Sequence, residues 1–262
     1  MAGSLLTHVS RVLSGYLYKE TCTCRTTAPL DPEVLKTVLK SGDVILIEGT
    51  QRISAAIKYL TQSTWSHAAF FAGPLPHDDP SSFTPCLIEA DAQHGVVAVP
   101  LEKYITHHIR ICRPVGITPA ERHQLVEFMT GKLGLQYDLK NIVDLLRYLL
   151  PEPPVPIRWR RRMLALGSGD PTRAICSTLI AQAFQSIQYP ILPLVHLGKD
   201  TEGAVKEILH IRHHSLFTPR DFDISPYFEI VKPSLYKGFD PHSLVWKDAD
   251  PDTETTRASW LC

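Results

Sequence analysis

The chain of 262 residues is 44% hydrophobic and 21% charged, a size and composition that fit one globular domain with elaborations. Its 27 basic and 27 acidic residues cancel, so no overall positive field indicates a nucleic-acid partner. No apolar run reaches the roughly 18–20 residues that span a bilayer. The N-terminus also lacks a secretory layout, because Arg11 interrupts its apolar stretch, so we expect a cytoplasmic protein.

The cysteines favour reduced thiols. All six are sparse and irregularly spaced, which argues against a disulfide framework. Cys22 and Cys24 have no second pair at zinc-finger spacing, so we expect neither a structural metal nor a cofactor.

The N-terminal segment carries a helical apolar stripe over residues 5–17. One interpretation is a helix that docks on the domain. The other is a helix on a membrane surface, with Cys22 and Cys24 beside it as acylation sites, which would make this a peripheral membrane protein. We expect residues 1–30, which end in a linker, to precede a main domain over residues 31–235 and a tail over residues 236–262.

The first half of the main domain is predicted to hold most of the strands. Asp31 followed by Pro32 indicates a helix start, and this helix ends near Ser41. A strand over residues 44–47 and a short helix over residues 53–60 follow. Short apolar or alternating runs bounded by turn residues then predict strands over residues 67–72, 86–90, 96–99 and 108–112. Such short connections favour an antiparallel sheet.

The second half is predicted to be mainly helical. Thr118 and Glu121 form a capping box that opens a helix ending near Gly131 or Gly134. The remaining elements are a helix over 139–150, a basic segment over 157–166, a helix over 176–188, an irregular insertion over 190–215 and a strand over 228–231. A second insertion is expected over 150–172. The predicted class is α+β, one antiparallel sheet with segregated helices.

Cys176 is the best candidate nucleophile. It stands at or next to the N-terminus of a predicted helix, after a loop with two glycines. The helix dipole and the free backbone N–H groups there stabilise a thiolate and can serve as an oxyanion hole. The alternative is a small buried core residue, an interpretation that suits Cys86 and Cys112 better because they lie inside strand patterns.

His67 is the best candidate base among the twelve histidines. It opens the apolar run Ala68–Phe71, at the mouth of a predicted strand. The adjacent pairs His107–His108 and His213–His214 lie in polar contexts that are typical of solvated loops. Glu89 is an acidic residue inside an apolar strand, where carboxylates are rare unless paired. Pairing with His67 would explain Glu89 and would fix the imidazole tautomer.

Four segments, taken in order, resemble the permuted branch of the NlpC/P60 papain-like superfamily, the group around bacterial YiiX and YaeF and a related poxvirus protein. They are Ser41–Leu46, Trp65–Phe70, Leu87–Ala90 and Ile175–Leu179. Residues 134–138 are similar to that group's Gly-x-x-Tyr-Asp segment, and residues 218–222 to its Thr-Pro-x-Asp element. The resemblance implies a circularly permuted papain-like fold, in which histidine, acidic residue and cysteine follow one another in that order.

The resemblance also implies a catalytic triad that works through a thioester acyl-enzyme. Its members are expected to be Cys176, His67 and Glu89. Substrate binding or oxyanion stabilisation is expected of Tyr137, Trp65 and Ser177. In one departure, Thr178 stands where the group commonly has a glutamate, so the acidic role at that position is unfilled.

Three functions stay open. The first is a cysteine-dependent hydrolase of amidase or peptidase type, acting on a peptide or another amide. The second is a thiol acyltransferase or lipid hydrolase, distantly like lecithin–retinol acyltransferase, acting on an acyl lipid at a membrane surface; residues 5–17 and the basic cluster Arg158–Arg162 favour it. The third is a non-catalytic ligand-binding module with a degenerate site.

Overall fold

The computed structural model describes residues 31–76, 83–91, 94–135, 175–199, 205–210 and 213–233, together with residues 19, 240 and 242. Several predicted segments lie outside the described residues: the stripe over 5–17, the linker, the helix over 139–150, the insertion over 150–172, the basic segment over 157–166 and most of the tail. Internal contacts divide the chain into two units, Met1–Lys232 and Pro233–Cys262, and the elements described below belong to the first.

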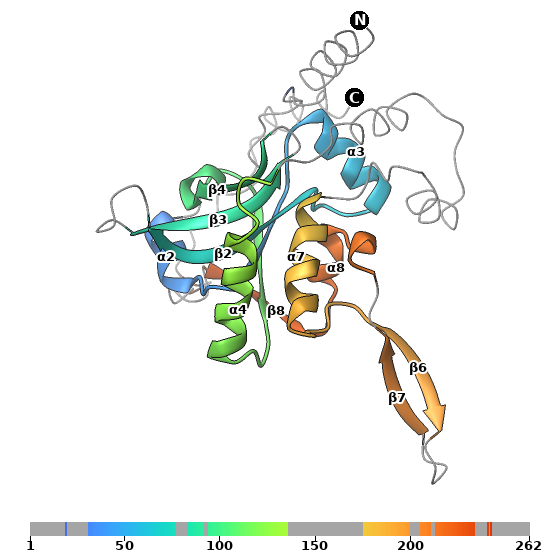
Figure 1. The fold of residues 1–262 in the computed structure, drawn as a ribbon. Helices are drawn as coiled ribbons and strands as arrows, with labels where there is room; N and C mark the ends of the chain where they lie inside the picture. The colour runs from blue at the N-terminus through green and yellow to red at the C-terminus, as the bar shows by residue number, and fades with distance from the viewer. Residues whose placement is uncertain are drawn as a thin grey trace, which may run out of the picture. The chain divides into compact units, whose positions relative to one another are not determined.

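A six-stranded antiparallel sheet runs in the order β4-β3-β2-β1-β5-β8 (Figure 1). The strands are β1 Val44–Ile47, β2 His67–Pro76, β3 Phe83–Asp91, β4 Gly95–Pro100, β5 Ile109–Pro114 and β8 Phe228–Val231. Each strand of this sheet was predicted within a few residues, and the antiparallel pairing is confirmed. The central strand β1 is buried along its whole length, because both faces of the sheet are covered.

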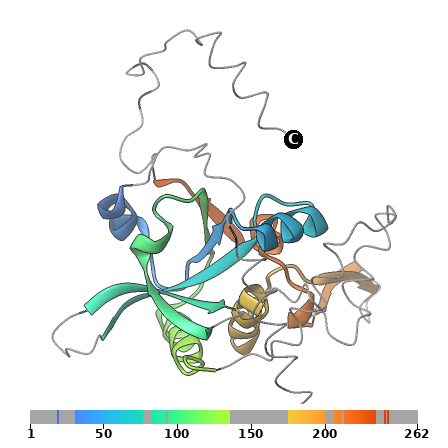
Figure 2. The ribbon, with the colours of Figure 1, turned by 90° about the horizontal axis from the view of Figure 1, so that it is seen from above.

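Helices cover the two faces of the sheet separately. One face packs against α4 Pro119–Thr130, α7 Ile175–Ser186 and α8 Pro219–Asp223. The other face packs against α2 Pro32–Val38 and the 3-10 turn η1 Leu101–Tyr104. Seen from above, α4 and α7 lie together on one side of the sheet (Figure 2). Helix α3 Arg52–Thr61 and the 3-10 turn η2 His214–Leu216 complete the described helical elements. The α+β class with segregated helices is confirmed.

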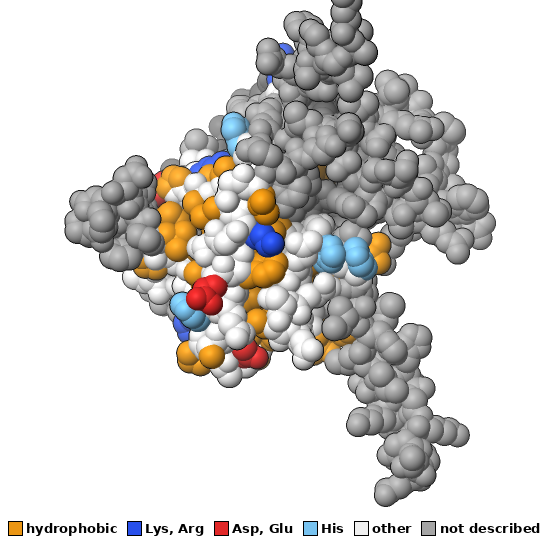
Figure 3. Space-filling view, viewed as in Figure 1, with side chains coloured by type: hydrophobic (Ala, Val, Ile, Leu, Met, Phe, Trp, Pro, Cys, Tyr) orange, Lys and Arg blue, Asp and Glu red, His pale blue; other side chains and the backbone are white. Residues whose placement is uncertain are grey.

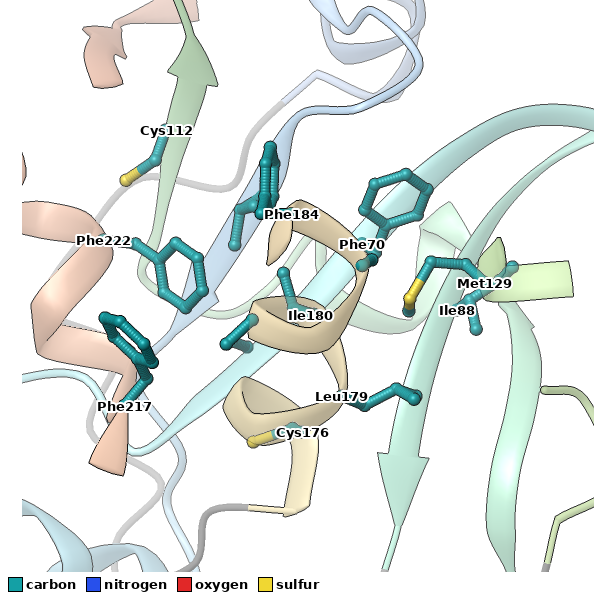
Figure 4. Packing of buried hydrophobic residues seen from close by; sticks show 14 of the residues in the cluster. Phe70, Ile88, Cys112, Met129, Cys176, Leu179, Ile180, Phe184, Phe217 and Phe222 are labelled. Carbon is teal, nitrogen blue, oxygen red and sulfur yellow. The ribbon is translucent and has the colours of Figure 1, made fainter. Parts of the chain in front are cut away.

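Helix α7 is the central element of the larger core. Its side chains Leu179, Ile180 and Phe184 are buried against the sheet, and Phe222 of α8 closes the same cluster (Figure 4). Burying side chains of this size contributes roughly 1.5–3 kcal/mol each. The apolar face therefore fixes how α7 lies on the sheet, and with it the position of Cys176 in the first turn of the helix.

The predicted helix starts are confirmed at α2 and α4. The Asp31 side chain accepts a hydrogen bond from the Glu33 N–H at 3.0 Å. At α4 the capping box is complete, with Thr118 and Glu121 each accepting from the backbone N–H of the other. Local sequence signals were sufficient here, because the groups that satisfy the ends of a helix lie within one turn.

The prediction of an irregular segment over residues 190–215 is wrong. A two-stranded antiparallel hairpin lies there, made of β6 Leu194–Lys199 and β7 Val205–His210. Each strand has only six residues, and Pro193 and Gly198 interrupt the alternating pattern that predicts a strand. Each run alone has only a weak strand pattern, and the two strands are stabilised by their pairing with each other.

A buried ion pair joins the start of β1 to β5. Arg113 donates from Nε to Asp43 Oδ1 at 2.9 Å and from Nη2 to Asp43 Oδ2 at 2.7 Å. The same Nη2 also donates to the Val38 carbonyl at 2.6 Å, at the end of α2. Asp43 is completely buried, and the preceding Gly42 has a φ of +95°, which makes the tight turn into β1. The Gly-Asp pair of this segment is therefore structural.

Arg113→Met is expected to lower the free energy of unfolding by about 3–5 kcal/mol, because it leaves a buried carboxylate without its partner. Urea denaturation followed by circular dichroism measures the loss. Lys36→Met is the control, since Lys36 and Glu33 form an exposed pair at 3.0 Å whose loss costs about 0–1 kcal/mol. Equal losses in the two variants would contradict a structural role for Arg113.

Candidate active site

Cys176 is the second residue of α7 and lies at the helix N-terminus. Its side chain is buried, and its surroundings are polar at the sulfur. Burial alone would raise the pKa of the thiol, but the charge and hydrogen bond of His67 and the backbone N–H groups of Ala68 and Ser177 together lower it. Because α7 sits on β2, the N–H of Ala68 can reach the sulfur. The surroundings of Cys176 therefore favour the thiolate form of its side chain.

His67 is the first residue of β2, at the end of the sheet where Ile47 of β1 pairs with it. Its side chain is 24% exposed. Burial lowers the pKa of the ring, yet the charge and hydrogen bond of Cys176 and those of Glu89 raise the pKa to about 10. Nε2 lies 3.1 Å from Glu89 Oε2, which leaves Nδ1 as the ring nitrogen for Cys176.

Glu89 lies on β3, diagonally across from His67. Phe70 pairs with Ile88, so the register brings Glu89 to the same face as His67, two positions away along the ladder. The carboxylate is only 1% exposed. Burial would raise its pKa, but His67, Lys103 and Tyr104 lower the pKa to about 2. Glu89 is therefore a buried, ionised carboxylate.

The sheet and α7 bring sulfur, imidazole and carboxylate together, with His67 in contact with both Glu89 and Cys176. The three groups come from α7, β2 and β3. Glu89 follows His67 by 22 positions along the chain, and Cys176 follows after a much longer stretch. His67 can contact both because it stands at the end of its strand, where a group from the face covered by α7 and one from the face covered by α2 and η1 are both within reach.

Of the other predicted site residues, Trp65 and Ser177 are buried next to the site. The Trp65 indole N–H donates to Asp223 Oδ2 at 2.9 Å, and the Arg110 guanidinium lies over the ring at 5.0 Å. The Ser177 hydroxyl donates to the Phe217 carbonyl at 2.9 Å. Both side chains thus hold neighbouring segments in place, and direct contact with substrate stays a prediction. Tyr137 lies outside the described residues.

Two further residues contact the site without having been predicted. Lys103 and Tyr104, both in η1, bind the carboxylate of Glu89. Neither stands in a motif, and the link to Glu89 arises only when β3 pairs with β4 and the chain turns back.

His108 was expected to be a solvated histidine, whereas its Nδ1 lies 3.0 Å from Glu48 Oε2 and its ring packs on Trp65.

The described part of the chain offers no group of three or more histidine, cysteine or acidic side chains arranged to hold a metal ion. Within the same residues, none of the helices has both the length and the hydropathy needed to cross a membrane. On the described part of the face in Figure 3, acidic and basic side chains are scattered among uncharged ones.

Residues 38–148 match the family model described as permuted papain-like amidase enzyme, YaeF/YiiX, C92 family. The match includes His67 and Glu89 and ends before Cys176. The crystal structure of metalloprotein yiiX from Escherichia coli O157:H7 is similar with a TM-score of 0.44 and 16% sequence identity, over 74% of this chain and 97% of that chain. No curated protein matches the chain.

The fold is permuted papain-like, and the function is of the cysteine-dependent hydrolase type. The resemblance stated from the sequence is supported by this match: over residues 38–148 the chain is similar to the permuted papain-like amidases of the YaeF/YiiX family.

Proposed function

We propose that the protein is an amidase or peptidase that works through a thioester on Cys176. The arrangement around the His67 ring carries this proposal. Glu89 holds Nε2, so Nδ1 is directed to the sulfur, and the burial of both neighbours strengthens their electrostatic interaction with the ring. A thiolate next to an imidazolium that a buried carboxylate orients is the arrangement that activates a cysteine nucleophile.

In the proposed reaction, the Cys176 thiolate attacks the carbonyl carbon of an amide. The carbonyl oxygen becomes an oxyanion, and the Cys176 backbone N–H, in the first turn of α7, donates a hydrogen bond to it. As the C–N bond breaks, the His67 imidazolium gives its proton to the leaving amine, and an acyl thioester remains. His67 then takes a proton from water, which attacks the thioester and releases a carboxylic acid and the thiolate.

The amide substrate is preferred over the two alternatives for different reasons. The family model matched by residues 38–148 is one of amidases, which supports an amide substrate; the segments that favour an acyl lipid, 5–17 and Arg158–Arg162, lie outside the described residues. A degenerate binding module has no need of a cysteine whose pKa is lowered by its neighbours, as is found at Cys176.

Trapping the acyl-enzyme tests the proposal. The full chain is incubated with N-acyl p-nitroanilides and p-nitrophenyl esters of different acyl groups, quenched in acid and digested for mass spectrometry. We expect the peptide that contains Cys176 to gain the mass of the acyl group, and the gain to disappear in hydroxylamine. Acylation confined to other residues, or none with any donor, would overturn the proposal. Transfer to an added lipid alcohol in preference to water would favour the acyltransferase instead.

A further inference from the structure

The carboxylate of Glu89 is held by three side chains, of which His67 is only one. Oε2 lies 3.1 Å from His67 Nε2 and also accepts a hydrogen bond of 2.6 Å from the Tyr104 hydroxyl. The other oxygen, Oε1, forms an ion pair and a hydrogen bond with the Lys103 ammonium. Both oxygens are thereby fixed, and the carboxylate cannot rotate without breaking one of these contacts.

Tyr104 and Lys103 are adjacent residues of η1 and reach Glu89 from the same turn. Glu89 pairs with Val97 of β4, and β4 leads directly into η1 at Pro100. Leu101, at the start of the turn, is 1% exposed and belongs to the same core as Tyr104. The packing of η1 therefore brings a phenol and an ammonium group back onto the strand that carries Glu89.

The buried charge of Glu89 explains the need for a cation next to it. Burial of a carboxylate that is only 1% exposed has a large desolvation cost, which its partners must offset. The Lys103 side chain is 40% exposed, so its ammonium keeps contact with water while it neutralises a buried charge. The charges then alternate along the site, from the Lys103 cation through the Glu89 anion and the His67 cation to the Cys176 thiolate.

We propose that Lys103 and Tyr104 are positioning residues of the active site: they hold Glu89 so that its Oε2 faces His67, and the thiolate of Cys176 depends on them through Glu89. The inference rests on the proposed function but concerns a separate set of contacts. It assigns a role in the site to η1, a segment that no motif in the sequence singles out.

The test uses iodoacetamide, which alkylates a cysteine thiolate and requires no substrate. Its rate at Cys176 is measured against pH in the full chain by mass spectrometry of the peptide. The variants are Lys103→Met, Tyr104→Phe and Glu89→Gln, and each of the first two combined with the third. Lys36→Met is the matched control, because Lys36 forms ion pairs with Glu33 and with Glu102 of the same turn but does not touch Glu89.

We expect Lys103→Met and Tyr104→Phe each to raise the midpoint of Cys176 alkylation by about half a pH unit or more, which slows the reaction about threefold at a pH well below the wild-type midpoint. In the Glu89→Gln background neither substitution should have a further effect, because both act through the carboxylate. Lys36→Met should match the wild type.

Two outcomes would overturn the inference. In the first, both variants alkylate as the wild type does. In the second, each slows the reaction equally with and without Glu89, as a general structural loss would. Failure of the proposed function gives a different result, since the wild-type protein itself would then titrate near the ordinary thiol pKa of about 8.5.

Discussion

Cys176→Ala is expected to lower kcat/KM for amide hydrolysis by at least about 10⁴-fold, because the acyl-enzyme forms on the sulfur that the substitution removes. The substitution removes one buried sulfur atom in the first turn of α7 and introduces a good helix former. The fold should therefore persist, with a change in the free energy of unfolding of about 1 kcal/mol or less. Hydrolysis of the best anilide or ester from the acylation screen provides the measurement.

Cys112→Ala is the matched control for the nucleophile. Cys112 is also fully buried in the same core, but burial and the charge of Asp223 raise the pKa of its thiol. It should thus stay protonated and inert, and its replacement should leave kcat/KM within about twofold. A Cys176→Ala enzyme that keeps more than about 1% of the wild-type rate would show that Cys176 is not the nucleophile.

His67→Gln is expected to lower kcat/KM by about 10²–10⁴-fold, the usual contribution of a general acid–base. Glutamine retains a polar side chain at the end of β2 but cannot carry the proton. The cation next to the sulfur is also lost, and only the backbone N–H groups of Ala68 and Ser177 then oppose the rise that burial causes in the pKa of the Cys176 thiol. Steady-state rates and the rate of acylation by a p-nitrophenyl ester should both fall.

His108→Gln is the matched control for the base. His108 also pairs with a carboxylate, Glu48, at 3.0 Å, and it contacts Trp65 close to the site. If proximity to the site were sufficient, the two variants would behave alike. We expect His108→Gln to keep kcat/KM within about threefold, because its ring is not in the proton path. Similar losses in both variants would remove the special role of His67.

Much of the fold could be predicted from the sequence because its signals are local. The run Val44–Ile47 and the capping box of Thr118 depend on residues within one strand or one turn, and both predictions are confirmed. The hairpin at β6 and β7 was missed because each strand is weak without its partner. The missed element therefore depends on the pairing of two weak strand segments, which the pattern of either segment alone does not show.

The residues of the candidate site also differ in whether a local sequence signal identifies them. Glu89 stood out because a carboxylate inside an apolar strand requires a partner, and the expected contact with His67 is present at 3.1 Å. Lys103 and Tyr104 gave no such signal, since a lysine and a tyrosine after a strand are ordinary surface choices. Their contact with Glu89 is a tertiary contact, which forms because η1 packs back against β3.

The pH dependence of the proposed site follows from the directions of the two shifts. The pKa of Cys176 is lowered and that of His67 is raised to about 10, so the thiolate–imidazolium pair persists between the two values. Activity should rise with pH as the thiol ionises, well below the ordinary value of about 8.5. It should fall again near pH 10, where His67 loses the proton that the leaving amine requires.

The titration of Cys176 alkylation in the wild type and in His67→Gln tests the thiolate–imidazolium pair most directly. We expect the wild-type rate to reach half of its plateau well below the ordinary thiol value of about 8.5, and the midpoint of His67→Gln to lie higher than that of the wild type. A wild-type midpoint near 8.5, unchanged by the loss of the imidazole, would contradict the pairing on which the site depends.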